Sequence, residues 1–237
     1  MEEQVVIENA IIDGDGVLQN FDQLVEGYVG ETDEASKIIS IEGKCGVGKS
    51  TWLREHGIMT EETVDFKVDE RTHNTKDGMI PLEEQLEFVT HKIEQFKEKL
   101  VELEQTGSNI YIDGSMLYNV SYGAGYYWWY HTTTAKEKDR EKVLNNAFEF
   151  VNNYLEKCDE LIKDLPEGWQ DKLESLILIP DNEDDLRERI LKRGRPSEVA
   201  NIDNMLRVNE YFYDYLIKIL DKYNIKYSFQ VIANRVD

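Results

Sequence analysis

The sequence predicts an α/β fold with a five-stranded parallel sheet flanked by helices. From Lys37 onward, short apolar runs alternate with long helical patterns, as is typical of β-α-β units. Apolar residues recur at steps of four and three from Leu82 to Leu103, which predicts an amphipathic helix that ends near Gly107. Similar stripes predict helices over 143–161 and 202–220. Strands are predicted at 38–41, 63–68, 109–112, 176–179 and 226–232.

The chain length favours one α/β domain with an appended segment. Of the 237 residues, 1–36 form an acidic N-terminal extension and 37–237 the predicted domain. Lys and Arg number 27 against 48 Asp and Glu, and the net charge of −21 would repel a polyanion. We therefore expect no extended nucleic acid as a partner. A single nucleotide remains compatible, because a phosphate pocket needs only a few donors.

The compartment is predicted from what the sequence lacks. Cys45 and Cys158 show neither metal-ligand nor paired-cysteine spacing. The first residues lack the basic character of a secretory signal, and no apolar run approaches the roughly 20 residues of a membrane span. These observations predict a cytoplasmic protein that does not contact a membrane.

A glycine-rich segment directly after the first predicted strand fits the pattern GxxxxGK[ST]. Such a loop turns its main-chain N–H groups inward around phosphates. Lys49 can then bridge the β- and γ-phosphates, and Ser50 can ligate Mg²⁺. The order strand, loop, helix predicts a P-loop NTPase fold that binds ATP or another nucleoside triphosphate. The candidate nucleotide-binding residues are Gly43, Lys44, Cys45, Gly46, Val47, Gly48, Lys49, Ser50 and Thr51.

Acidic residues follow two predicted strands, where open α/β sheets place their ligands. Asp113 follows the strand at 109–112 and is a candidate Mg²⁺ ligand with Ser50; the alternative is that it caps the next helix. Glu70 follows the strand at 63–68 and is the candidate base that accepts the proton of an attacking hydroxyl. Asp69 competes for that role.

A basic run near residue 190 predicts an arginine-rich lid over about 187–199. Arg189 and Arg193 are four residues apart and hence on one helical face, Gly194 ends or bends the helix, and Arg195 follows. Guanidinium groups that close over transferring phosphates would stabilise the transition state. The alternative is a solvated, salt-bridged surface.

From about residue 37 to 220 the chain resembles the deoxynucleoside kinase family of P-loop kinases, as a divergent member. The motifs IEGKCGVGKST and LRERILKRGRPSE carry the resemblance. It implies that Gln85 pairs with a nucleobase, that Lys92 stands where the family has an arginine, and that Glu198 contacts the sugar 3′-hydroxyl. The alternative for Gln85 is an exposed helix residue. Family members are usually dimers, which implies a homodimer here.

The sequence departs from the family in two places. Glu70 is followed by Arg71 where the family has proline, and Gly114 replaces an arginine that faces phosphate. Either Arg71 or Lys44 compensates, the acceptor differs, or activity is low. The aromatic run at 122–130 could stack a base, but packing against helices is the preferred interpretation.

The sequence favours an enzyme that phosphorylates the 5′-hydroxyl of a deoxynucleoside with ATP and Mg²⁺. A nucleoside monophosphate kinase of the thymidylate type is the alternative within enzymes. A nucleotide-dependent switch protein without a small acceptor is the alternative from another class. A kinase of DNA ends is disfavoured by the charge.

Overall fold

The computed structural model describes residues 35–58, 79–136, 138–182, 184–194, 198–199 and 202–232. All of these except Ala35 belong to one unit of the chain, Ser36–Asp237. The expected N-terminal extension, 1–36, lies outside the described residues except for its last two positions.

The described part of the chain holds a parallel sheet of four strands, not the five expected. The strand order is β2-β1-β3-β4, and every neighbouring pair is parallel. The strands are β1 (Ile38–Glu42), β2 (Ile110–Asp113), β3 (Leu173–Pro180) and β4 (Lys226–Ile232). The expected strand at 63–68 lies outside the described residues. β3 begins three residues before its predicted start because Glu174 and Ser175, although polar, are buried in it.

All three predicted helices are present and slightly longer than their apolar stripes. The helices are α3 (Lys49–Glu55), α4 (Leu82–Thr106), α5 (Met116–Thr133), α6 (Arg140–Ile162), α7 (Asp184–Arg193) and α9 (Ile202–Lys222), with a 3₁₀ turn η4 (Trp169–Lys172). α4 ends as predicted: Gly107 adopts a left-handed conformation with φ of 60°, and its N–H bonds to the Leu103 carbonyl.

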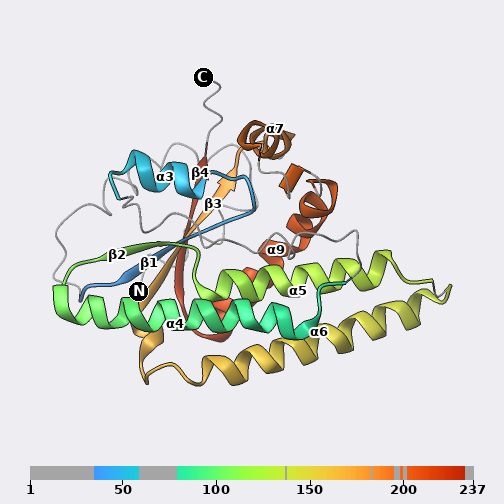
Figure 1. Cartoon of the computed structure of the whole chain (residues 1–237), viewed down its shortest axis with the longest axis horizontal. Helices are drawn as coiled ribbons and strands as arrows, with labels where there is room; N and C mark the ends of the chain where they lie inside the picture. Colours follow the sequence, from blue (N-terminus) through green and yellow to red (C-terminus); the bar gives the residue numbers. More distant parts are fainter. Residues whose placement is uncertain are drawn as a thin grey trace, which may run out of the picture. The chain divides into compact units, whose positions relative to one another are not determined.

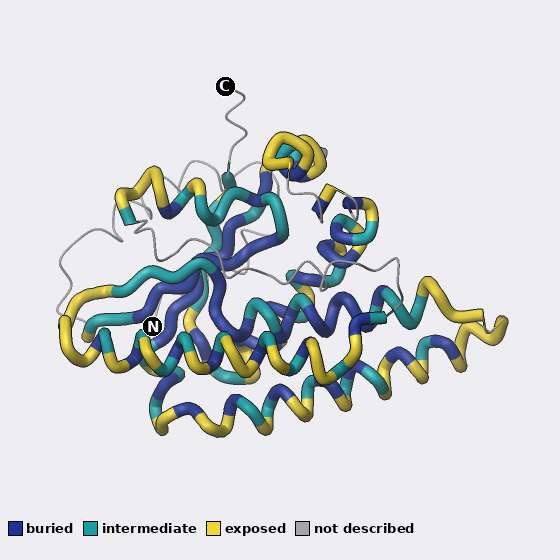
Figure 2. The backbone as a smooth tube through the Cα atoms, viewed as in Figure 1, coloured by how far each residue is buried: buried dark blue, intermediate teal, exposed yellow. Residues whose placement is uncertain are grey.

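The two faces of the sheet carry separate apolar cores, because side chains alternate along each strand. Ile38 packs into the larger core with α4, α5, α6 and α9, whereas Ile39 and Ile41 pack into a smaller core with Leu53 of α3 and Leu186 of α7. Figure 1 shows α4, α5 and α6 side by side below the sheet and α3 and α7 above it. β1 and most of β3 are buried and drawn dark blue in Figure 2, whereas β2 and most of β4 are half-buried and drawn teal.

The aromatic run lies on α5, and its packing follows the preferred interpretation. Tyr126, Tyr127 and Trp129 are buried in the larger core. The Tyr126 hydroxyl accepts a hydrogen bond from Ile80 N at 2.9 Å, and the Tyr127 hydroxyl donates to Ile80 O at 3.2 Å. These rings therefore fix the chain that leads into α4.

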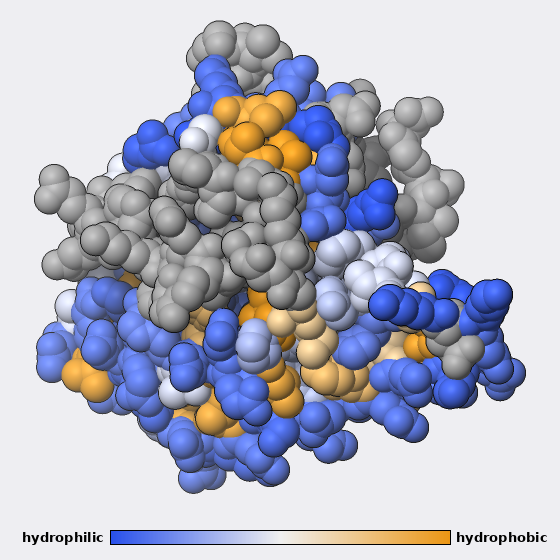
Figure 3. All heavy atoms as spheres, turned by 45° about the vertical axis from the view of Figure 1, so that its right-hand side comes forward, coloured by the Kyte–Doolittle hydropathy of each residue, from blue (hydrophilic) through white to orange (hydrophobic). Residues whose placement is uncertain are grey.

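Hydrophilic residues make up most of the described surface on the face drawn in Figure 3. Among the helices that the structure describes, none has both the length and the apolar character needed to cross a bilayer.

Candidate functional site

The glycine-rich segment forms a tight loop between β1 and α3 whose shape requires glycine. Gly43, Gly46 and Gly48 have φ of 142°, 87° and 106°, a region that side-chain-bearing residues rarely adopt. A Cβ at Gly43 would stand 2.7 Å from the Leu178 carbonyl oxygen, and one at Gly46 would stand 2.9 Å from Ile190 Cγ1. The missing side chains thus let the loop sit directly against β3 and α7.

α9 braces the loop from the side with two residues that the sequence analysis did not single out. The Asn209 side chain, 1% exposed, accepts from Cys45 N at 3.3 Å and donates to Cys45 O at 3.5 Å. Tyr213 accepts from Lys44 N at 3.4 Å and donates to the Leu178 carbonyl at 2.6 Å. These two loop amides bond to α9 in this conformation. A polar residue within the apolar stripe of α9 was the sequence signal for Asn209.

Lys49, the first residue of α3, points back across the loop. Its Nζ donates to Gly43 O at 2.9 Å and lies 4.6 Å from the centre of the Tyr118 ring. The ammonium group therefore lies close to the first residue of the loop, where it could contact an anion bound by the loop. Val47 is fully buried in the smaller core, whereas Thr51 lies exposed on α3.

Ser50 and Asp113 meet at the ends of α3 and β2. The Ser50 hydroxyl donates to Asp113 Oδ2 at 2.7 Å. Asp113 does not cap the next helix: Ser115 is the N-cap of α5 and accepts from Leu117 N at 3.1 Å. A hydroxyl and one carboxylate beside a phosphate loop are the hard oxygen donors that Mg²⁺ takes together with substrate phosphates. The residues present fit Mg²⁺ in this role, although the described residues contain no cluster of three or more His, Cys, Asp or Glu side chains.

Glu42, the last residue of β1, was not predicted as a site residue. Its side chain is fully buried, and its Oε1 accepts from Ser40 Oγ at 2.6 Å, Ser115 Oγ at 2.7 Å and Ser115 N at 3.1 Å. Burial raises the pKa of Glu42, while the hydrogen bonds from Ser40 and Ser115 and the charge of Lys49 oppose this shift. The sequence signals for this carboxyl are its place directly before Gly43 and the break that it makes in the apolar pattern of β1.

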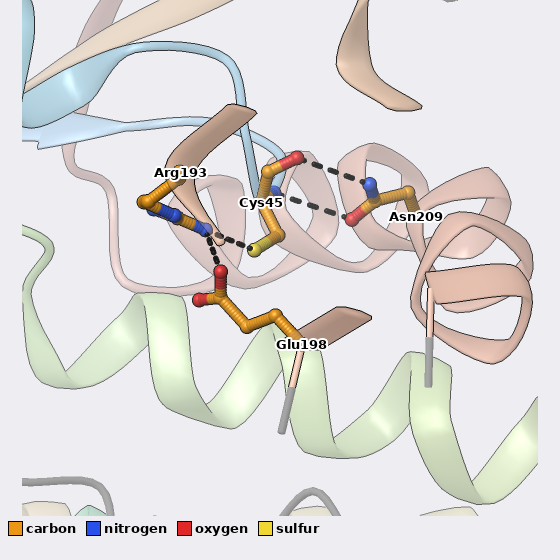
Figure 4. Close-up of polar contacts among 4 residues, drawn as sticks. All are labelled: Cys45, Arg193, Glu198 and Asn209. Atoms are coloured by element: carbon orange, nitrogen blue, oxygen red, sulfur yellow. Dashed lines mark hydrogen bonds and ion pairs between the residues drawn. The ribbon is translucent and has the colours of Figure 1, made fainter. Parts of the chain in front are cut away.

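Two of the three predicted lid arginines reach the loop. Arg189 donates to Val47 O at 2.8 Å, and Arg193 lies 3.5 Å from Cys45 Sγ. Figure 4 shows Arg193 between Cys45 and the buried carboxylate of Glu198, which it meets at 2.5 Å. Burial and the nearby Glu198 raise the pKa of the Cys45 thiol, whereas Arg193 opposes the shift.

Of the expected substrate residues, Gln85 and Lys92 lie on α4, and Glu198 follows α7 in the chain. Gln85 is buried, not exposed, and hydrogen-bonds to the hydroxyl of Tyr154 on α6. Lys92 is half-buried; burial lowers its pKa, whereas Asp113 and Glu42 oppose that shift. Glu198 pairs with Arg193 near the loop.

Four residues of the sequence analysis lie outside the described residues: Asp69, Glu70, Arg71 and Arg195. Of the two cations suggested to replace the missing arginine at Gly114, Lys44 is described. It is buried, and its Nζ lies 4.9 Å from the centre of the Tyr213 ring.

Comparison with known proteins finds similar chains among the solved structures. No protein-family model and no curated protein sequence matches the chain. The chain is similar to a solved structure of deoxyadenosine kinase from M. mycoides with bound dATP, at 17% identity and a TM-score of 0.49, over 84% of this chain and 92% of that one. At a TM-score below 0.5 this likeness carries no argument about activity or substrate, which must rest on the residues of the site.

Proposed function

We propose that the chain is a nucleoside-kinase-like phosphotransferase, which moves the γ-phosphoryl group of ATP or another nucleoside triphosphate to the 5′-hydroxyl of a deoxynucleoside. The observation that carries the proposal is the convergence of opposite charges on one glycine loop. Lys49, Arg189 and Arg193 contact the loop, and the Ser50–Asp113 pair stands beside it. The dimeric state and cytoplasmic location expected from the sequence belong to the same proposal.

The residues take roles set by their charge. Lys49 and the guanidinium groups of Arg189 and Arg193 balance the negative charge that spreads over the transferring phosphoryl oxygens. Arg195 acts with them from the proposed lid. Ser50 and Asp113 would hold Mg²⁺, which supplies neutralisation of the β- and γ-phosphate charge.

The acceptor side completes the reaction. Glu70 takes the proton of the 5′-hydroxyl, the oxygen attacks the γ-phosphorus, and the bond to the β–γ bridging oxygen breaks so that the nucleoside diphosphate leaves. Gln85 and Lys92 bind the base side of the acceptor, and Glu198 binds its sugar.

An acceptor panel tests the proposal. The full chain is incubated with γ-labelled ATP, Mg²⁺ and separate nucleosides, nucleoside monophosphates and oligonucleotides. We expect label on a deoxynucleoside and its loss in Lys49→Ala. Lys97→Ala, which removes a half-buried lysine paired with the exposed Glu94 on α4, serves as the matched control. Label on a monophosphate would replace the proposal with the thymidylate-type reaction. Bound ATP without transfer to any acceptor would favour the switch protein.

A further inference from the structure

The turn after β2 is tied to the end of β1 at three points. Gly114 N donates to the Ile41 carbonyl at 3.1 Å, and Ser115 donates twice to Glu42, from its N–H at 3.1 Å and its hydroxyl at 2.7 Å. Two of the three bonds therefore depend on one carboxyl oxygen, Glu42 Oε1. Asp113, the candidate metal ligand, lies two residues before Ser115.

The same residue adjoins the phosphate loop. Glu42 is followed by Gly43, whose carbonyl accepts from Lys49 Nζ at 2.9 Å. The side chain of Glu42 thus holds the turn that carries Asp113, and its backbone leads into the loop that carries Lys49 and Ser50. A shift of this turn would move Asp113 away from the Ser50 hydroxyl, which it meets at 2.7 Å.

The hydrogen bonds within the fold account for only one of the two carboxyl oxygens of Glu42. Glu42 is 0% exposed, and its second oxygen, Oε2, is buried with no hydrogen-bond partner among the described residues. A buried acceptor without a partner destabilises the folded state. Such a cost is typical of positions selected for function and not for stability.

We propose that Glu42 is a positioning residue for the candidate metal ligands Asp113 and Ser50. Glu42 holds the Asp113–Ser115 turn so that the oxygens of Asp113 and Ser50 lie together. The inference rests on the proposed function, because it assumes that these two residues ligate Mg²⁺ beside bound nucleotide. Glu42 itself touches neither Asp113 nor Ser50 in the contacts described. Its effect passes through Ser115.

The test measures binding and needs no acceptor. The affinity of the full chain for the imido analogue of ATP is measured by calorimetry with Mg²⁺ and with EDTA, for wild type and variants that thermal melting shows to be folded. Glu42→Ala should weaken binding with Mg²⁺ by about 10- to 100-fold, the usual effect of losing a residue that orients a metal ligand. Binding in EDTA should be unchanged. Glu42→Gln keeps an acceptor oxygen at the same reach and should restore the Mg²⁺-dependent gain.

Two serines separate positioning from general stability. Ser115→Ala removes a donor from the turn and should reduce the Mg²⁺-dependent gain, whereas Ser40→Ala removes a donor to the same oxygen from within β1 and should leave it intact. Because Ser115 also caps α5, Asp139→Ala, which removes the N-cap of α6, is the control for a lost cap.

Three results would overturn the inference: equal losses with Mg²⁺ and with EDTA in Glu42→Ala, a Glu42→Gln variant as impaired as Glu42→Ala, or a wild type whose affinity gains nothing from Mg²⁺. If the variants behave as expected but no acceptor is labelled in the panel assay, the proposed kinase activity fails while the role of Glu42 stands.

Discussion

Replacing Gly43 by alanine should destabilise the fold more than replacing any glycine that has open space around it. The new Cβ would stand 2.7 Å from the Leu178 carbonyl oxygen and 2.9 Å from Val47 Cγ1. The Leu178 carbonyl cannot retreat easily, because Leu178 is fully buried in β3 and this oxygen already accepts from the Tyr213 hydroxyl at 2.6 Å. Strain at positive φ adds to the overlap.

The magnitude follows from a comparison with Gly107. Both glycines have positive φ, 142° and 60°, but a Cβ at Gly107 would meet nothing within 4 Å. Gly107→Ala should therefore lose only the conformational preference, about 1–2 kcal/mol. Gly43→Ala should lose that amount and about 1–3 kcal/mol more for overpacking. At about 2–4 °C per kcal/mol for a chain of this size, the extra loss is an additional fall in Tm of about 2–12 °C.

Thermal melting of both variants, with nucleotide binding measured below the lower Tm, provides the assay. Gly43→Ala should also lose affinity for ATP, because the Gly43 carbonyl is the acceptor for Lys49 Nζ. Gly107→Ala should bind ATP as the wild type does. Equal Tm values for the two variants would refute the packing of this loop against β3.

Two further predictions concern Arg193 and Cys158. Arg193→Ala should lower kcat by about a hundredfold, as expected for a lost transition-state donor, and should lower nucleotide affinity much less. Arg187→Ala, which removes an arginine paired with Asp203 on the surface, is the control. Equal losses of kcat and affinity in Arg193→Ala would contradict the role of Arg193 in transition-state stabilisation. Burial raises the pKa of Cys158 to about 12, so its thiol should resist iodoacetamide at pH 8 in the native protein and react after denaturation. Peptide mass spectrometry measures the labelling of Cys158. Labelling of this cysteine in the native protein would contradict its burial.

The sequence was informative where the relevant signal is local. The tight glycine loop after β1 could be predicted because its glycines, Lys49 and Ser50 lie within nine residues. The position of Asp113 at the end of β2 could be predicted because it follows an apolar run directly. The end of α4 at Gly107 is a similar case. Each of these predictions uses only the conformational needs of neighbouring residues.

The contacts that complete the site could not be predicted because they join distant residues. Asn209 meets Cys45 across 164 positions, and Ser115 meets Glu42 across 73. The burial of Gln85 also depends on the packing of α5 and α6 around α4, which periodicity does not report. The fold brings these partners together only after the sheet order is set.

These long-range contacts share a feature that a sequence can show before their partners are known. Ser40 and Glu42 interrupt the apolar strand β1, and Asn209 interrupts the apolar face of α9; all three side chains are buried. Apolar residues there would give a simpler core, since a buried polar group stabilises a fold only when its hydrogen bonds are made. Asn209 bonds to the backbone of the glycine loop, and Glu42 bonds to the turn beside it. Polar residues that break an apolar pattern next to a recognised motif are therefore better candidates for supporting residues of a site than the many acidic residues exposed on this chain.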